Sequence, residues 1–375
     1  MDPRGTIIKG GRSVVERHQL YARVLDETSP GSRLLIISKE LSQSSLRTTE
    51  NQLVPLEIVY VKAGPFFFLR YLNKSRRIIE FEKGNRVLLI AGDPWISFYF
   101  AQVIRNTLKA SPGVQLQLHG DIFDKNWKQL RWRNCIKSEL AKLSLRFATN
   151  IRVNTELQSS AISSIVNTKK VLLTVAPVPF TVPGTLVPEV NNRTRPRSIG
   201  FVGRLHSERG TSEFVHLVKR LPIKKMGLDV YVMGEGSERA NLETALRNAV
   251  DGQGIFFLGN LSGRELEVAW QKIGVSIFTA PSESYGLAMR ESLVRGIPIW
   301  TFPTVGALEL VKCLSKDNTE SVRVMDSSAN KTELERWLEK SLDIQVPDII
   351  KSRLFTDRSV GLQSLIESWL RQTKD

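Results

Sequence analysis

The chain has few cysteines and no long uninterrupted apolar segment. Its 375 residues include two cysteines, Cys135 and Cys313, which are far apart and form no C-x-x-C pair. This content excludes a disulfide framework and a thiolate zinc site, and it favours a reducing compartment. The first residues lack the apolar core of a signal peptide, and the most apolar stretch is interrupted by Asp93 and Pro94. We therefore expect a cytoplasmic protein whose membrane contact, if any, is peripheral, on the inner face of the cytoplasmic membrane.

Acidic residues are scarce in the first half of the chain. The first 190 residues carry 27 Lys and Arg against 15 Asp and Glu, whereas the remainder carries 26 against 23. The net charge of +15 therefore belongs mostly to the N-terminal half. This asymmetry indicates an anionic partner, namely a nucleic acid, an anionic membrane surface or a phosphorylated acceptor, although a role in solubility alone would give the same pattern.

The chain has no internal repeat and no low-complexity tract, and its length suits two domains. Short apolar runs alternate with longer periodic stretches, which is typical of parallel α/β domains. The expected strands cover residues 33–38, 56–61, 87–90, 114–118, 150–153, 170–175, 199–202, 229–233, 255–258, 275–279 and 297–301. The expected helices cover residues 13–25, 69–82, 95–110, 126–148, 210–220, 238–250, 262–272, 287–295 and 359–372.

Residues 178–198 are rich in Pro, Asn and Thr and interrupt every periodicity, which indicates a linker. We therefore predict an N-terminal Rossmann-like acceptor domain over residues 1–180, a linker over 181–198 and a C-terminal Rossmann-like donor domain over 199–355. Residues 356–375 form a final helix, expected to pack back on the N-terminal domain. Doubly wound domains bind ligands at the carboxyl ends of their strands, so two such edges facing each other would make one cleft.

The strongest motif is A-P-S-E-S-Y-G-L-A-M-R-E, which begins at Ala280 after an expected strand. Glu283 and Glu291 stand eight residues apart, and Gly286 opens a helix between them. Free N–H groups at a helix start suit phosphate or sugar oxygens, and a carboxylate one turn further can accept hydrogen bonds from a ribose diol. The alternative interpretation makes Glu283 a helix-capping carboxylate and Glu291 a solvated helix residue.

This motif resembles the E-x7-E element of retaining glycosyltransferases of family 4, and the resemblance extends over nearly the whole chain. Further similar segments are F-V-G-R-L-H-S-E-R-G from Phe201, V-M-G-E-G from Val232, F-L-G-N-L from Phe257 and T-V-G-A-L-E-L-V from Thr304. In the first half, G-G-R-S-V-V-E-R-H from Gly10 and L-H-G-D from Leu118 resemble the family's glycine loop and histidine element. The resemblance implies a GT-B fold: α/β, with two facing Rossmann-like doubly wound domains and a C-terminal helix crossing back.

The resemblance implies specific roles for individual residues. The catalytic group would be His119, Glu283, Arg204 and Arg209, with the two arginines on the donor diphosphate and His119 and Glu283 on the transferred sugar. Arginine suits this role because its planar fork binds phosphate through two bonds, although the family usually has lysine at the position of Arg209. The alternative is that both arginines are surface residues paired with Glu208. The full donor-binding set would be Gly10, Gly11, Arg204, Arg209, Gly234, Gly259, Glu283, Tyr285, Gly286, Leu287 and Glu291.

The chain contains no D-x-D motif, the usual metal-diphosphate site of the other large glycosyltransferase fold. We therefore expect no essential metal and no cofactor, since the nucleotide-sugar is a substrate. The leaving diphosphate would be stabilised by Arg204, Arg209 and helix N-termini.

Aromatic and basic side chains stand together in the segment P-F-F-F-L-R-Y-L-N-K-S-R-R, which begins at Pro65. Such a segment can dock on an anionic lipid surface, and residues 126–146 could extend the patch. Equally, the phenylalanines could pack into the core and the cations could be solvated. The residues concerned are Phe66, Phe67, Phe68, Arg70, Lys74, Arg76 and Arg77.

The sequence thus predicts a metal-independent, retaining hexosyltransferase. It would move a sugar from a nucleotide-sugar to a saccharide or lipid-linked saccharide acceptor in cell-surface polysaccharide or glycolipid synthesis. Three alternatives remain open: a sugar phosphorylase or epimerase on the same fold, a non-catalytic relative and a basic nucleic-acid-binding protein. The last is disfavoured because no helix-turn-helix, RRM-like or zinc-finger pattern is present.

Overall fold

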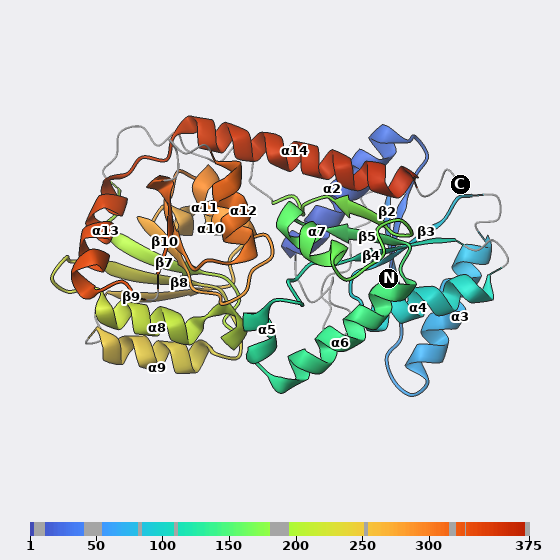
Figure 1. Cartoon of the computed structure of the whole chain (residues 1–375), viewed down its shortest axis with the longest axis horizontal. Coiled ribbons are helices and arrows are strands. Elements are labelled where there is room, and N and C mark those ends of the chain that lie inside the picture. Colours follow the sequence, from blue (N-terminus) through green and yellow to red (C-terminus); the bar gives the residue numbers. More distant parts are fainter. Residues whose placement is uncertain are drawn as a thin grey trace. The chain divides into compact units, whose positions relative to one another are not determined.

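The chain divides into two compact units in the computed structural model (Figure 1). The structure describes residues 1–3, 12–40, 55–81, 85–108, 112–180, 195–250, 254–314, 320–326 and 328–371. The first unit comprises Met1–Ile122, Trp132–Pro179 and Ser359–Asp375, and the second comprises Phe123–Arg131 and Phe180–Arg358. The chain therefore passes into the second unit twice before the last helix returns it to the first.

The first unit is built from parallel strands. Its four-stranded sheet has the order β3-β4-β5-β6, and β1 and β2 form a separate parallel pair. The strands are β1 (Leu34–Lys39), β2 (Leu56–Val61), β3 (Leu88–Ala91), β4 (Gly113–Gln117), β5 (Asn150–Val153) and β6 (Leu172–Val175). The helices are α2 (Arg12–Thr28), α3 (Phe67–Phe81), α4 (Ile96–Thr107), α6 (Trp132–Phe147), α7 (Glu156–Ser163) and the last part of α14 (Asp348–Arg371).

Helix α14 is fixed to the first unit by apolar packing and by buried hydrogen bonds. Leu362, Leu365, Ile366 and Trp369 pack in one cluster with Tyr21 of α2. The indole Nε1 of Trp369 also donates to Oε1 of Gln115 on β4 at 2.9 Å, and the Gln115 amide donates to Ser368 at 3.0 Å. A buried polar group that lacks a hydrogen bond destabilises the fold, so these bonds give this end of α14 a defined position on the sheet.

The second unit contains one six-stranded parallel sheet with the order β12-β11-β10-β7-β8-β9. The strands are β7 (Ser198–Val202), β8 (Asp229–Met233), β9 (Ile255–Gly259), β10 (Val275–Phe278), β11 (Ile299–Thr301) and β12 (Val322–Val324). From the other edge the order is β9-β8-β7-β10-β11-β12. Strands β7, β8 and β9 follow one another toward one edge, and β10, β11 and β12 follow one another toward the opposite edge, as in a dinucleotide-binding domain. The order reverses between β7 and β10, and ligands bind doubly wound sheets at this point.

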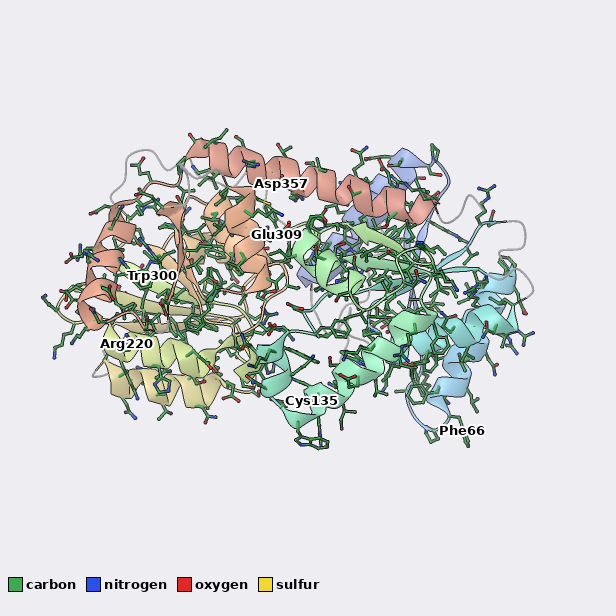
Figure 2. The ribbon with its side chains drawn as sticks, in the orientation of Figure 1. Phe66, Cys135, Arg220, Trp300, Glu309 and Asp357 are labelled. Carbon is green, nitrogen blue, oxygen red and sulfur yellow. The ribbon has the colours of Figure 1, made fainter. Side chains whose placement is uncertain are left out.

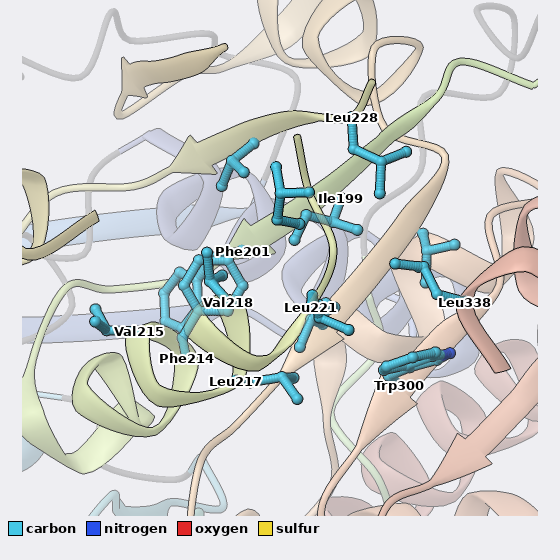
Figure 3. Packing of buried hydrophobic residues seen from close by; sticks show 14 of the residues in the cluster. Ile199, Phe201, Phe214, Val215, Leu217, Val218, Leu221, Leu228, Trp300 and Leu338 are labelled. Carbon is cyan, nitrogen blue, oxygen red and sulfur yellow. The ribbon is translucent and has the colours of Figure 1, made fainter. Parts of the chain in front are cut away.

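Helices cover both faces of this sheet (Figure 1). Helices α8 (Thr211–Arg220), α9 (Arg239–Ala249) and α13 (Lys331–Asp343) pack in one apolar core with Ile199, Phe201 and the fully buried Trp300 (Figure 3). The other face carries α10 (Gly263–Trp270), α11 (Leu287–Val294), α12 (Val305–Cys313) and the start of α14. The short helices η1 (Ser207–Arg209) and α5 (Lys125–Gln129) complete the unit.

Several expected boundaries are wrong. The helix expected over residues 126–148 is two helices, α5 and α6, because α5 begins where Asp124 caps the amide of Trp127 and ends before Leu130. Ser198, expected in the linker, is the first residue of β7, and the last helix begins at Asp348 rather than at residue 356. Residues 181–194 of the expected linker lie outside the described residues.

Helices α7, α12 and α13 and strand β12 were not predicted. All three helices have side-chain N-caps that mark their starts in the sequence. Thr155 accepts from the amide of Gln158 and Thr304 from that of Ala307, while Asn330 and Glu333 form a capping box. None of the helices in the described ranges combines the length and the apolar character needed to cross a membrane.

Candidate active site

The loops that follow β7 and β10 are joined where the strand order of the second unit reverses. The hydroxyl of Thr279, directly after β10, donates to the carbonyl of Gly210 at 2.7 Å. Gly210 is left-handed with φ of 72°, and a Cβ at this position would lie 1.9 Å from the carbonyl oxygen of Thr279. Only glycine permits this conformation together with this approach. The loop before α8 is therefore fixed against the end of β10.

The two predicted groups Arg209 and Glu283 meet across this junction. Nη1 of Arg209 and Oε2 of Glu283 form an ion pair whose side chains are 32% and 20% exposed. Arg204 instead pairs with Glu208 at 3.1 Å, on the surface. The interpretation of both arginines as partners of Glu208 is thus right for Arg204 and wrong for Arg209. The pair places a cation and a carboxylate together after the carboxyl ends of β7 and β10, where doubly wound sheets typically bind ligands.

The loop from Glu283 to Gly286 rests on two further residues. The amide of Gly306, in α12, donates to the carbonyl of Glu283 at 2.7 Å, and a Cβ on Gly306 would lie within 2.9 Å of the Tyr285 backbone. The buried guanidinium of Arg290 donates to the carbonyl of Tyr285 and lies 3.6 Å from the centre of its ring. This packing fixes the backbone that carries Glu283.

Helix α11 starts at Leu287, directly after Gly286, which is left-handed with φ of 73°. The cap residue is this glycine, which has no side chain, whereas Glu283 pairs with Arg209 and accepts from the amide of Tyr285 at 3.5 Å. The first turn therefore presents amide groups toward the edge of the sheet, where they suit an anion. Glu291 lies one turn into the helix and is half-buried.

The turns after β8 and β9 stack on the loop after β7. The amide of Gly234 donates to the carbonyl of Gly259 at 2.8 Å, and a Cβ on Gly234 would lie 1.9 Å from the carbonyl oxygen of Gly203. The amide of Leu205 donates to the carbonyl of Glu235 at 2.9 Å. Both predicted glycines, Gly234 and Gly259, thus lie beside the loop that carries Arg204 and Arg209.

His119 belongs to the first unit, in the loop after β4. Its Nδ1 lies 3.3 Å from Nη1 of Arg152, and its carbonyl accepts from the side-chain Nδ2 of Asn154 at 3.2 Å. Surrounding protein atoms, and then the charges of Arg152 and Arg17, lower the pKa of His119 to about 3, although the residue reaches solvent. The imidazole is therefore neutral at physiological pH. Gly10 and Gly11 lie outside the described residues.

Sequence reasoning missed four residues that position this chemistry: Thr279, Arg290, Gly306 and Arg152. Gly306 lies inside the similar segment that begins at Thr304, and Thr279 ends an expected strand, but nothing local indicates what they contact. An arginine inside an amphipathic helix, such as Arg290, is usually solvated. Arg152 had one signal, since it is a cation in a short strand that is otherwise apolar, I-R-V.

The aromatic and basic segment contributes to both the core and the surface of the first unit. Phe67 is buried in a cluster with Ile37, Val61 and Tyr71, whereas Phe66 is 77% and Phe68 53% exposed. Figure 2 shows Phe66 at the turn before α3. Three of the cations are exposed but have partners: Arg70 donates to the carbonyl groups of Lys62 and Ala63, Lys74 donates to that of Tyr60, and Arg76 pairs with Glu80. Arg77 is also exposed.

Other exposed apolar side chains of the first unit follow helical spacing. On α6 they are Trp132, Ile136, Leu140, Leu143 and Phe147, and on α4 they are Ile96, Tyr99 and Val103. The rings of Phe68 on α3 and Phe100 on α4 are 5.3 Å apart, and the indole of Trp95 donates to the carbonyl of Lys137 on α6. An apolar surface of this kind, rimmed by cations, indicates an interaction site.

Comparisons with known proteins find similarity in the second unit and in the fold of the whole chain. Residues 185–343 match the family model "Glycosyl transferases group 1". Over 155 residues the chain is 24% identical to 2-deoxystreptamine glucosyltransferase of Streptomyces kanamyceticus, covering 41% of this chain and 38% of that protein. Over 113 residues it is 26% identical to a GDP-mannose-dependent alpha-mannosyltransferase of Mycobacterium tuberculosis, covering 30% and 27%. The aligned part thus spans under two fifths of these relatives.

The solved structure of Anabaena HepE in complex with UDP and glucose has a similar fold over 97% of both chains. The TM-score is 0.66 and the sequence identity is 15%. At this identity the likeness concerns the fold alone. The chain therefore has the GT-B fold with two Rossmann-like units, and its second unit matches the family model of group 1 glycosyl transferases.

Proposed function

We propose that the protein is a retaining glycosyltransferase that takes a hexose-type sugar from a nucleotide-sugar and transfers it to a saccharide or lipid-linked saccharide. The observation that carries this proposal is the junction at the strand reversal of the second unit. There Arg209 and Glu283 pair, Gly210 is fixed against Thr279, and the amide end of α11 follows within a few residues. A cation, a carboxylate and free amides are the groups that a sugar diphosphate requires.

In this proposal the second unit binds the donor. Arg204, Arg209 and the start of α11 hold the diphosphate, and Glu291 accepts hydrogen bonds from the ribose. Glu283 contacts the sugar hydroxyls. Bond breakage at the anomeric carbon places negative charge on the leaving diphosphate, and preformed cations and amides stabilise this charge without reorganising. The acceptor hydroxyl then replaces the nucleoside diphosphate at the same carbon.

A thermal-shift screen tests donor binding. The chain is heated with UDP, GDP, ADP and their hexose conjugates, without an added metal. At a hundredfold excess over its Kd, the matching nucleotide should stabilise the fold by about 2.7 kcal/mol. Arg209→Met and Glu291→Gln should lose this shift. The control Arg264→Met removes an exposed arginine on α10 and should keep it. A flat response to every nucleotide would overturn the proposal.

Stereochemistry and metal dependence need separate assays. With the donor identified, proton NMR of the first sugar released by transfer or by slow hydrolysis reports its anomeric configuration. Retention is the expected result, and inversion would refute that part. Activity should survive EDTA. Consumption of the donor by phosphate alone, or its conversion to an epimer, would instead support the sugar phosphorylase or epimerase alternative.

We further propose that the first unit docks on an anionic lipid surface. The exposed apolar stripes of α4 and α6, with Phe66 and Phe68, support this step. Basic residues such as Arg133, Lys137 and Arg146 flank the α6 stripe and are partly or fully exposed. Apolar side chains that enter the headgroup region beside lysines and arginines give binding that depends on lipid charge.

Vesicle flotation tests the docking step. The chain should float with vesicles that contain anionic lipid and remain behind with neutral ones. Ile136→Glu combined with Leu140→Glu should abolish flotation, whereas Val268→Glu, at an exposed apolar site on α10, should not. Phe67 is unsuitable for this test because it is buried, and its truncation would damage the core. Equal flotation of all variants would remove the membrane claim.

A further inference from the structure

We propose that Arg152 is a positioning residue that holds His119 in the neutral form protonated on Nε2, so that the ring donates a hydrogen bond to an oxygen of the donor sugar. This inference rests on the proposed function and on the contact with the transferred sugar that the family resemblance implies for His119. It adds a residue of the first unit that the sequence motifs do not contain.

The sheet register brings the two residues together. Gln117 on β4 pairs with Arg152 on β5, so both side chains project from one face of the sheet. His119 is two residues beyond Gln117, which returns it to the same side if the extended backbone continues. The amide of Leu118 donates to the carbonyl of Arg152 at 2.9 Å, which extends the pairing to the residue before His119.

Arg152 is held firmly in place. The residue is 1% exposed, and its Nε donates to the carbonyl of Ala176 at 2.5 Å. Its Nη1 then lies 3.3 Å from Nδ1 of His119. The Nε and Nη1 atoms of Arg152 can only donate hydrogen bonds, because arginine stays protonated in proteins. In this contact Nδ1 must accept, so the ring proton resides on Nε2.

The surrounding charges act in the same direction. Arg152 on β5 and Arg17 and His18 on α2 all disfavour a second proton on His119. A neutral imidazole that donates through Nε2 can approach a sugar hydroxyl or ring oxygen without attracting the donor phosphates. An imidazolium would instead attract the negative charge of those phosphates. Arg152 therefore keeps His119 neutral, so that the ring contacts the sugar and does not attract the phosphates.

Nitrogen NMR of the wild-type chain tests the tautomer directly. The chain has four histidines, and His119→Gln identifies the signal of His119 by its loss. We expect Nε2 to be protonated and Nδ1 to be unprotonated, with no titration between about pH 5 and pH 8. A signal that titrates near the ordinary histidine pKa, or one protonated on Nδ1, would overturn the inference.

Arg152→Met then tests the consequence, with Arg23→Met, at an exposed arginine on α2, as the control. In Arg152→Met the His119 pKa should rise and the Nδ1-protonated form should appear. The kcat should fall about 10- to 100-fold while the KM for the nucleotide-sugar changes little, since a misplaced N–H group on His119 affects mainly the transition state. Arg23→Met should change neither quantity. If the tautomer shifts while kcat stays constant, the positioning role is overturned.

A matched pair at His119 separates this inference from the proposed function. The amide nitrogen of glutamine can replace Nε2, whereas that of asparagine is too short and lies nearer Nδ1. His119→Gln should therefore keep more transfer activity than His119→Asn, and equal activities would contradict donation from Nε2. Loss of nucleotide binding in the thermal-shift screen would instead refute the proposed function, with the NMR result unaffected.

Discussion

Replacing Gly210 by alanine should damage both the stability and the donor site of the second unit. Gly210 has φ of 72°, and the added Cβ would lie 1.9 Å from the carbonyl oxygen of Thr279. The left-handed conformation alone costs an alanine about 1–2 kcal/mol. A clash with backbone cannot be relieved by a rotamer change, and overpacking of this kind typically costs about 1–3 kcal/mol more.

Gly227→Ala provides the matched control. Gly227 has φ of 60° and lies in the same unit, but a Cβ there would meet nothing within 4 Å. Gly227→Ala should therefore lose about 1–2 kcal/mol, and Gly210→Ala about 2–5 kcal/mol. The measurement is urea unfolding followed by tryptophan fluorescence, with the midpoints compared at a constant m-value.

Nucleotide binding separates the two variants further. Arg209 directly precedes Gly210 and pairs with Glu283, so moving Gly210 away from Thr279 moves the guanidinium as well. Gly210→Ala should weaken nucleotide affinity at least about tenfold, which is about 1.4 kcal/mol, while Gly227→Ala should leave it unchanged. Equal loss of stability in both variants, or intact nucleotide binding by Gly210→Ala, would refute the argument that this contact builds the site.

Three further predictions follow from single contacts. Glu283→Gln should bind the nucleoside diphosphate several-fold more tightly, because the loss of a partly exposed ion pair worth about 1 kcal/mol releases Arg209 for the phosphate. The rate of sugar transfer should fall, because Glu283 no longer contacts the sugar as a carboxylate. Titration calorimetry measures the first effect and a rate assay the second, and weaker nucleotide binding would contradict the prediction. Arg295→Met should cost about 3–5 kcal/mol in urea unfolding, because Glu267 would lose its bidentate partner while both side chains are over 90% buried, and Arg295→Met with Glu267→Met should recover most of this loss. The pKa of His119 is lowered from 6.5 to about 3 on folding, so the unfolded chain takes up the proton first as the pH falls. The stability that the neutral ring contributes above pH 6.5 should therefore be lost as the pH falls toward 3. The change in urea midpoint between about pH 7.5 and pH 5 should be smaller for His119→Gln than for the wild type, and an equal change in both would contradict this prediction.

The sequence by itself determined the alternation of strands and helices in both halves. It also determined the positions of Glu283, Gly286 and Glu291 around the start of α11. These features depend on residues within one turn or one strand of each other, where periodicity and backbone preference act directly. The capped starts of α7, α12 and α13 were equally local and could have been predicted from Thr155, Thr304 and Asn330.

Only the tertiary structure decided which distant groups meet. Arg209 could have paired with Glu208, beside it in the sequence, but the order of β7 and β10 brings Glu283 to it. The burial of Phe67 between exposed Phe66 and Phe68 depends on how α3 packs on its neighbours. Arg152 reaches His119 because the register of β4 and β5 sets them on one face, and a shift of one residue would separate them. Register, strand order and helix packing are properties of the assembled sheet, and no short segment of the chain encodes them.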